Sequence, residues 1–234
     1  MRPFVLAVHG SSLPTAAATL ERLCDAVERL GGIRPVLGHL DHQSPSLAEA
    51  LSESAVVVPL LLGDGYHRTV DIPAVVEGHG MDCVLTPGLS GEPAIAVALR
   101  DRLREAEERA GVRADAVVLA AAGSSRPGGN DGALVAARQL RALLPGVPVR
   151  TAYCSAAKPG VPEAVARLRA AGHGRVAVAT HLLAPGRFTL ALAGAGADAV
   201  SAPIADHAEV GRLVLHRYEV AHVPAVSPLL PEPA

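Results

Sequence analysis

The sequence has 234 residues and a formal net charge of −2; half of its residues are hydrophobic, but only 2% are aromatic. This length suits one large domain or two smaller ones, and the charge offers no basic surface to nucleic acid or to an anionic membrane. The scarcity of aromatic rings also argues against stacking platforms for single-stranded nucleic acid.

The cysteines and the N-terminal residues point to a reducing compartment. Cys24, Cys83 and Cys154 are far apart and form no CxxC pair, so neither a disulfide framework nor a structural zinc site is expected. The apolar run near the N-terminus is too short for a signal peptide or a membrane span. We therefore expect a soluble protein of the bacterial cytoplasm.

Apolar runs rich in Val and Leu alternate with segments of helical period, a pattern typical of β-α units that form a buried parallel sheet. The first series predicts strands at 3–8, 34–39, 55–61 and 82–85, and helices at 14–31, 45–52, 71–77 and 93–109. The second series predicts strands at 116–121, 148–153, 175–181 and 197–201, and helices at 130–144, 161–171, 186–194 and 207–220.

The two series form an internal repeat. The segment LAVHGSS at 6–12 returns as LAAAGSS at 119–125, so that Ala122 stands in the place of His9. Further along, VVPLLLGDGYHRTVDI matches VATHLLAPGRFTLAL, which pairs His67 with Phe188. The repeat predicts a first half at 1–113 and a degenerate second half at 114–222, followed by a Pro-rich, disordered tail at 223–234.

Two histidines follow predicted strands of the first half. In open parallel sheets, ligands bind beyond the carboxyl ends of the strands. His9 ends the first strand and opens a Gly-Ser-Ser turn whose amides can hold an anion, and His67 follows the third strand in a glycine-containing loop. A single histidine at a strand end is more often a surface or capping residue, but these two are expected at the same sheet edge. Neutral imidazoles there can bind a divalent metal or accept a proton.

Other catalytic motifs do not fit the chain. A histidine phosphatase would carry Arg immediately before the histidine, where Val8 stands. No GxSxG motif occurs between a predicted strand and a helix. The segment GSSRPGGNDG lacks both the GxGxxG spacing and a P-loop lysine, so nucleotide binding is not expected.

The segments VHGSSLP, VPLLLGDGYHRTVDIP, AAGSS, APGRF and LVLHRYE, in this order, resemble the sirohydrochlorin chelatases. These are class II metal chelatases of the CbiX and SirB type, here in the fused two-half form of actinobacteria. The resemblance covers about residues 3–221. It implies two flavodoxin-like, three-layer α/β/α halves with parallel sheets that face a central cleft. The implied activity is ATP-independent insertion of Fe(II) or Co(II) into sirohydrochlorin, for siroheme or cobalamin, with His9 and His67 binding the metal and helping to remove the pyrrole protons.

An anionic tetrapyrrole needs hydrogen-bond donors and cations in the cleft, whatever the charge of the whole chain. The residues expected to contact it are Gly10, Ser11, Ser12, Gly65, Tyr66, Arg68, Arg126, Lys158 and Arg187. For each of the basic residues, a solvated loop charge is the alternative. No organic cofactor, nucleic acid or membrane partner is expected. Because both halves lie on one chain, a monomer is expected.

Several positions depart from the pattern of the relatives. Ser12 stands where relatives commonly carry Arg, and Glu92 stands in a fourth-strand loop where they often carry His. Glu92 is interpreted as a solvated helix charge in preference to an oxygen ligand. His39 and His42 flank the second strand on the expected cleft side, and one of them is a candidate to touch substrate. His181 is expected to be buried within or at the end of its strand.

Three functions remain open after this comparison. The leading hypothesis is a ferrochelatase of siroheme synthesis, and the close alternative is a cobaltochelatase of cobalamin synthesis. A non-catalytic tetrapyrrole-binding or metal-binding protein is the third, suggested by the missing Arg near His9. The presence of both His9 and His67 argues against it, because a protein that only binds the macrocycle needs no paired metal and proton site.

Overall fold

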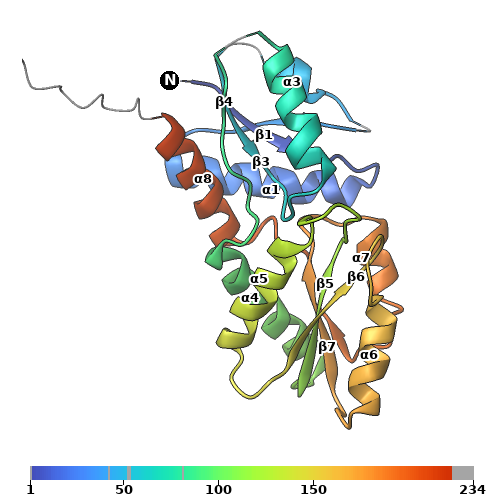
Figure 1. Ribbon diagram of the computed structural model, residues 1–234. Coiled ribbons are helices and arrows are strands. Elements are labelled where there is room, and N and C mark those ends of the chain that lie inside the picture. The colour runs from blue at the N-terminus through green and yellow to red at the C-terminus, as the bar shows by residue number, and fades with distance from the viewer. Residues whose placement is uncertain (1, 42, 52–53, 81, 223–234) are drawn as a thin grey trace, which may run out of the picture.

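A computed structural model describes residues 2–41, 43–51, 54–80 and 82–222, so the predicted tail at 223–234 and His42 lie outside it. The chain forms two parallel four-stranded sheets with helices on their faces (Figure 1). The strand order is β2-β1-β3-β4 in the first sheet and β6-β5-β7-β8 in the second, which is the same topology twice. The predicted repeat and the predicted α/β fold class are confirmed.

Every predicted helix and strand is present, with shifts at the ends. The strands are β1 (Phe4–Val8), β2 (Val36–His39), β3 (Val56–Pro59), β4 (Val84–Leu85), β5 (Ala116–Ala121), β6 (Val149–Tyr153), β7 (Val176–His181) and β8 (Ala199–Val200). The helices are α1 (Pro14–Gly31), α2 (Leu47–Ala50), α3 (Ile72–Gly78), α4 (Pro93–Ala110), α5 (Asp131–Leu143), α6 (Val161–Ala170), α7 (Arg187–Leu192) and α8 (Ala208–His222). The sequence did not predict η1 (His67–Asp71), a π-helical turn that runs directly into α3.

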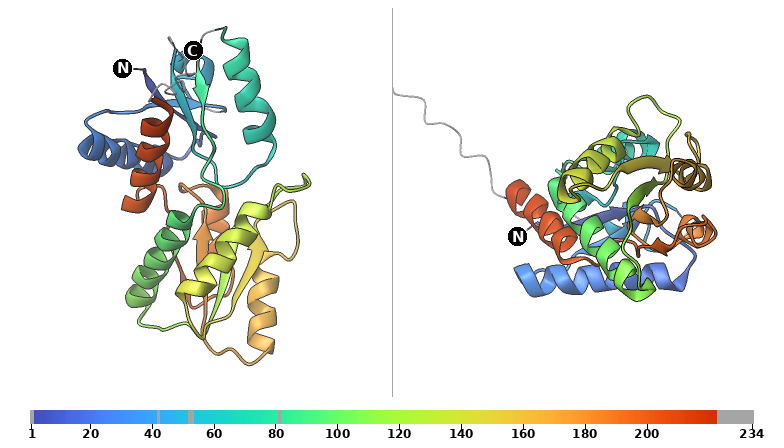
Figure 2. Two further views of the ribbon diagram at one scale, coloured as in Figure 1. Left: turned by 60° about the vertical axis from the view of Figure 1, so that its left-hand side comes forward. Right: turned by 90° about the horizontal axis from the view of Figure 1, so that it is seen from below.

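The last helix of each half packs against the other half. Helix α4 closes the first series, yet it contacts α5, β7 and β8 of the second; α8 ends the second series and contacts α1 and β3 of the first. Figure 1 shows α8 beside α1 and α4 beside α5, and Figure 2 shows the same arrangement from two further sides. The predicted boundary at 113 falls in the connection from α4 to β5. Each half thus contributes its last helix to the packing of the other half.

This exchange joins the two halves through a shared core. One buried apolar cluster includes Leu6 of β1, Leu23 of α1, Leu99 of α4, Leu119 of β5 and Val214 of α8. Two smaller clusters fill the opposite faces of the two sheets. No helix among the described residues is long and apolar enough to cross a membrane. Among the described residues, Cys24, Cys83 and Cys154 form no disulfide.

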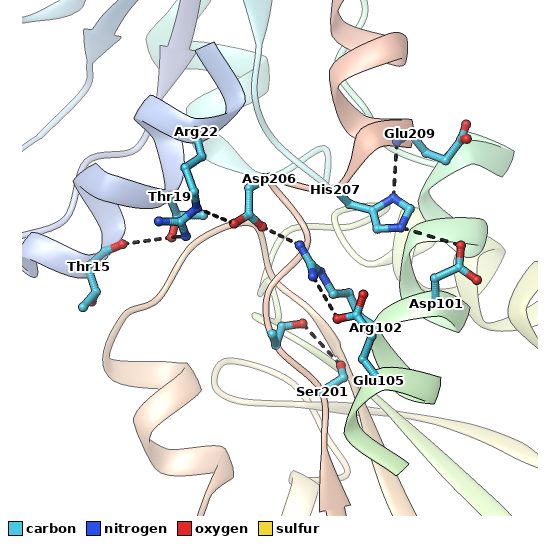
Figure 3. Close-up of polar contacts among 11 residues, drawn as sticks. Thr15, Thr19, Arg22, Asp101, Arg102, Glu105, Ser201, Asp206, His207 and Glu209 are labelled. Carbon is cyan, nitrogen blue, oxygen red and sulfur yellow. Dashed lines mark hydrogen bonds and ion pairs between the residues drawn. The ribbon is translucent and has the colours of Figure 1, made fainter. Parts of the chain in front are cut away.

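A charged bridge reinforces the exchange. Asp206, in the connection from β8 to α8, accepts hydrogen bonds from Arg22 of α1 at 2.8 Å and from Arg102 of α4 at 2.7 Å (Figure 3). The side chains of Asp206 and Arg102 are each only 18% exposed. One carboxylate of the second half therefore links two helices of the first half, α1 and α4. Because this carboxylate is poorly exposed, losing one partner leaves a poorly solvated charge.

We expect Asp206→Asn to lower the free energy of unfolding by about 2 kcal/mol, because it keeps the shape of the side chain but leaves Arg102 without this counterion. The matched control is Glu163→Gln, which breaks an exposed pair with Arg167 within α6 and is expected to cost under about 0.5 kcal/mol. Urea unfolding measures both values. Equal losses would contradict a structural role for the bridge.

Candidate metal site in the cleft between the halves

The carboxyl ends of the two sheets meet at one cleft of about 740 Å³. Its walls include the ends of β1 and β3 from the first half and the ends of β5 and β7 from the second. This volume lies within the usual range for small-molecule sites, about 300 to 1,000 Å³. The cleft lies where parallel sheets bind ligands, beyond the carboxyl ends of their strands.

The turn after β1 brings His9 next to the end of β2. The amide of Asp41 donates a hydrogen bond to the carbonyl oxygen of His9 at 2.9 Å. Gly10 has a φ of +95°, and a Cβ at this position would overlap the carbonyl oxygen of Asp41. Only glycine fits this backbone conformation and this close approach, so the glycine of the turn keeps His9 and Asp41 together.

The turn η1 positions His67. The amide of Ile72 donates to the carbonyl oxygen of His67, the five-residue spacing of a π-turn. Such turns occur frequently at functional sites. The Nδ1 atom of His67 lies 2.6 Å from a carboxylate oxygen of Asp71. If this nitrogen donates its hydrogen to Asp71, Nε2 keeps its lone pair for a metal, as metal-binding histidines commonly do.

His9, Asp41 and His67 form a group that could hold a metal ion. One ligand atom from each lies within 4.8 Å of the others. The rings of His9 and His67 have centroids 4.6 Å apart, and Nδ1 of His9 lies 3.5 Å from Asp41. All three side chains are partly exposed. Two imidazoles and one carboxylate suit iron and cobalt, and three protein ligands leave coordination positions open for another ligand.

The second half repeats the backbone of this site without its ligands. Gly123 has a φ of +91° and approaches the carbonyl oxygen of Ser155 as Gly10 approaches that of Asp41. The amide of Ser155 donates to Ala122 at 2.9 Å, again as in the first half. Ala122, Ser155 and Phe188 therefore occupy the places of the three candidate ligands. The glycine turn belongs to the architecture of both halves, whereas the ligands are present in one.

Sequence reasoning missed Asp41 and Asp71. Asp41 comes two residues after β2, so the rule that pointed to His9 and His67 could also have pointed to this carboxylate. Asp71 had no such signal: its contact with His67 depends on the π-turn, which an apolar periodicity does not reveal. Sequence inspection favoured His39 and His42 near this strand.

Most of the residues expected to contact substrate line the cleft. They are His9, Gly10, Ser11, Ser12, Gly65, Tyr66, His67, Arg68 and Arg187. Arg68 donates from Nε to Asp64 at 2.5 Å, and the exposed Arg187 has its guanidinium 4.7 Å from the centre of the Phe188 ring. The cleft thus has an arginine from each half.

Two predicted basic contacts lie elsewhere. Arg126 and Lys158 are exposed, and neither belongs to the described residues that line the cleft. The Arg126 guanidinium lies 5.6 Å from the ring centre of Tyr66, which itself lines the cleft. Both basic residues follow strands as predicted, but a position after a strand does not fix the direction of a long side chain.

Three further expectations need correction or refinement. The amide of Ser11 donates to the side chain of Gln43 at 3.1 Å, so it already has the acceptor that a substrate carboxylate was expected to supply. His39 is buried, which lowers its pKa, and it lines a separate, smaller cavity. Glu92 directly precedes α4 and lies outside the metal-binding group, but it pairs with Arg217 of α8 and is not the solvated charge that was expected.

The comparisons with known proteins agree with this architecture. The sequence model of the CbiX family matches residues 3–106 and again residues 116–221. A curated relative, the sirohydrochlorin cobaltochelatase of Methanopyrus kandleri, is 34% identical over 80 residues, which cover 31% of this chain and 56% of the relative. The match therefore spans little more than half of that relative.

Solved structures match nearly the whole chain. SirB from Bacillus subtilis with Fe³⁺ is 23% identical with a TM-score of 0.75, over 95% of this chain and 96% of that one. The sirohydrochlorin chelatase SirB from Bacillus subtilis subspecies spizizenii in complex with cobalt is 20% identical with a TM-score of 0.72, over 94% and 95%. These structures share the fold, and the two family matches cover both halves: the chain belongs to the CbiX family.

Proposed function

We propose that this protein is a sirohydrochlorin chelatase that inserts a divalent metal, Fe(II) for siroheme synthesis, without ATP. The observation that carries the proposal is the group of His9, Asp41 and His67, whose two histidines line a two-sided cleft. Membership of the CbiX family supports it. A protein that only carried the macrocycle would not need three metal-binding side chains there.

The donor set suits a metal that must be released. Two neutral imidazoles and a carboxylate hold the ion, yet they leave positions at which the nitrogens of the macrocycle can bind. As these nitrogens replace the protein ligands, the macrocycle loses two pyrrole protons. The imidazoles of His9 and His67, released from the metal, can each accept one of them. The macrocycle binds the metal more tightly than the open site, so no nucleotide is needed to drive insertion.

The rest of the cleft suits an anionic, flat ligand. Apolar side chains such as Leu20, Leu62 and Leu183 line it, while Arg68 and Arg187 can pair with carboxylates. Because both walls come from one chain, we expect the protein to act as a monomer. The proposed location is the cytoplasm.

Cobalt insertion is the second candidate. The relative from Methanopyrus kandleri is named a cobaltochelatase, and the two SirB structures hold Fe³⁺ and cobalt respectively. Imidazole and carboxylate ligands accept both metals, and affinity alone follows a general order that does not select iron. Fe(II) and Co(II) must therefore be compared directly.

Anaerobic metalation of sirohydrochlorin, followed by absorbance, tests the proposal. We expect the protein to accelerate the reaction with Fe(II) and with Co(II), equally with and without ATP, and faster with Fe(II) at equal free metal. Equal rates with and without protein would overturn the chelatase function. Tight macrocycle binding without acceleration would indicate the non-catalytic carrier instead.

Asp71 should act by positioning His67. We expect Asp71→Ala to weaken Co(II) binding about tenfold or more, the usual effect of losing a carboxylate that holds a metal-binding histidine. Asp64→Ala is the matched control, because it removes a carboxylate from the same segment that pairs with Arg68 and not with His67. Calorimetric titration with Co(II) measures both. Equal loss of metal affinity in the two variants would contradict this role.

A further inference from the structure

Four residues at the ends of the middle strands line the cleft, and only one of them is polar. Val8 ends β1 and Leu60 directly follows β3 in the first sheet, whereas Ala121 ends β5 and His181 ends β7 in the second. All four residues line the cleft. His181 is the repeat partner of Leu60. His181 is only 4% exposed, so a polar ring stands at a buried position where the first half has leucine.

The imidazole of His181 has polar atoms to satisfy. Among the described residues, no side chain or backbone group forms a hydrogen bond with either ring nitrogen. By contrast, its neighbour Thr180 donates through both its amide and its hydroxyl to Ser201. The ring nitrogens of His181 do not belong to the buried side-chain atoms without a partner, so they open onto the cleft, where a ligand can bind them.

The ring remains neutral at physiological pH. Burial lowers the pKa of His181 to about 4. A neutral imidazole carries one N–H donor and one acceptor nitrogen, and it cannot form an ion pair with a carboxylate. Either the N–H group or the acceptor nitrogen of the ring can therefore pair with an uncharged partner that offers both donors and acceptors, whereas Arg68 and Arg187 match the carboxylates.

We propose that His181 hydrogen-bonds the central nitrogens of the metal-free tetrapyrrole from the second half, across the cleft from His9 and His67. This inference rests on the proposed function. The metal-free macrocycle presents N–H donors and free nitrogen acceptors at its centre, and metalation removes both. His181 thus binds the substrate better than the product, and it gives the half without metal ligands a role in discriminating between them.

The test compares binding of sirohydrochlorin with binding of cobalt-sirohydrochlorin, by fluorescence quenching and by absorbance. His181→Leu copies the leucine that the first half accommodates at the same place, and His181→Gln keeps a donor and an acceptor. We expect His181→Leu to raise the Kd for sirohydrochlorin about tenfold, as for a lost buried hydrogen bond. The Kd for the cobalt form should change less than about threefold, and His181→Gln should restore most of the preference for the metal-free form.

Three results would overturn the inference: an unchanged Kd for sirohydrochlorin, an equal loss for both ligands, or a larger loss for the cobalt form, which would make His181 an axial metal ligand. A thermal unfolding temperature of His181→Gln equal to that of the wild type shows that the binding measurements compare folded proteins. If the wild type binds both ligands but does not accelerate metalation, the proposed function fails while the binding preference still decides the role of His181. If the wild type binds neither ligand, both proposals are wrong.

Discussion

Replacing His67 by alanine is expected to lower the rate of metal insertion at least about 100-fold. The substitution removes a ligand of the metal and a proton acceptor, and general acid–base groups alone contribute about 10² to 10⁴ in rate. His9→Ala should have a comparable effect. The double variant should lose little more than either single one, because the two imidazoles act as a unit. Initial rates of anaerobic metalation at saturating sirohydrochlorin measure all three.

His173→Ala is the control for these variants. His173 lies 3.6 Å from Asp115 and is absent from the cleft lining. Its removal deletes an imidazole from the chain and is expected to leave the rate within about twofold of the wild type. A His67→Ala protein that keeps more than a tenth of the wild-type rate would contradict the assignment of His67.

The second large effect is expected from Gly10→Ala. The new Cβ would overlap the carbonyl oxygen of Asp41 at a φ of +95° that side chains rarely adopt. Relief of the overlap must separate His9 from Asp41. We expect a loss of about 2 to 4 kcal/mol in the free energy of unfolding, and at least about tenfold weaker Co(II) binding.

Gly123→Ala places the same strain in the second half. It would overlap the carbonyl oxygen of Ser155, at the turn that carries Ala122 in place of a histidine. We expect a similar loss of stability, but unchanged affinity for Co(II). Urea unfolding and calorimetric titration distinguish the two outcomes. Weaker metal binding in Gly123→Ala would contradict the assignment of the metal site to the first half alone.

The sequence was sufficient to predict the repeat, the strands, the α-helices and the common sheet edge of His9 and His67, because these depend on local patterns. The exchange of α4 and α8 could not be predicted in this way. Apolar residues at helical spacing show that a helix has a face to bury, but they do not say which sheet it covers. The choice depends on the path of the chain between the halves.

The site was predictable where the backbone alone decides the position of a residue. His9 follows a strand in a tight turn, and the glycine of that turn fixes its place. His39 shows the limit of the same rule: it is the last residue of β2, but it is buried and lines a separate cavity instead of the cleft. His181 was correctly expected to be buried at a strand end, but the sequence did not show that it lines the cleft.

The most direct test is a single-turnover transfer of metal. The protein is loaded with one equivalent of Co(II), freed of excess metal and mixed anaerobically with sirohydrochlorin. We predict that one cobalt ion per chain enters the macrocycle faster than from the same concentration of free Co(II), and that His9→Ala, His67→Ala and Asp41→Ala abolish the advantage. Transfer no faster than from free metal would contradict a site that delivers its metal to the macrocycle.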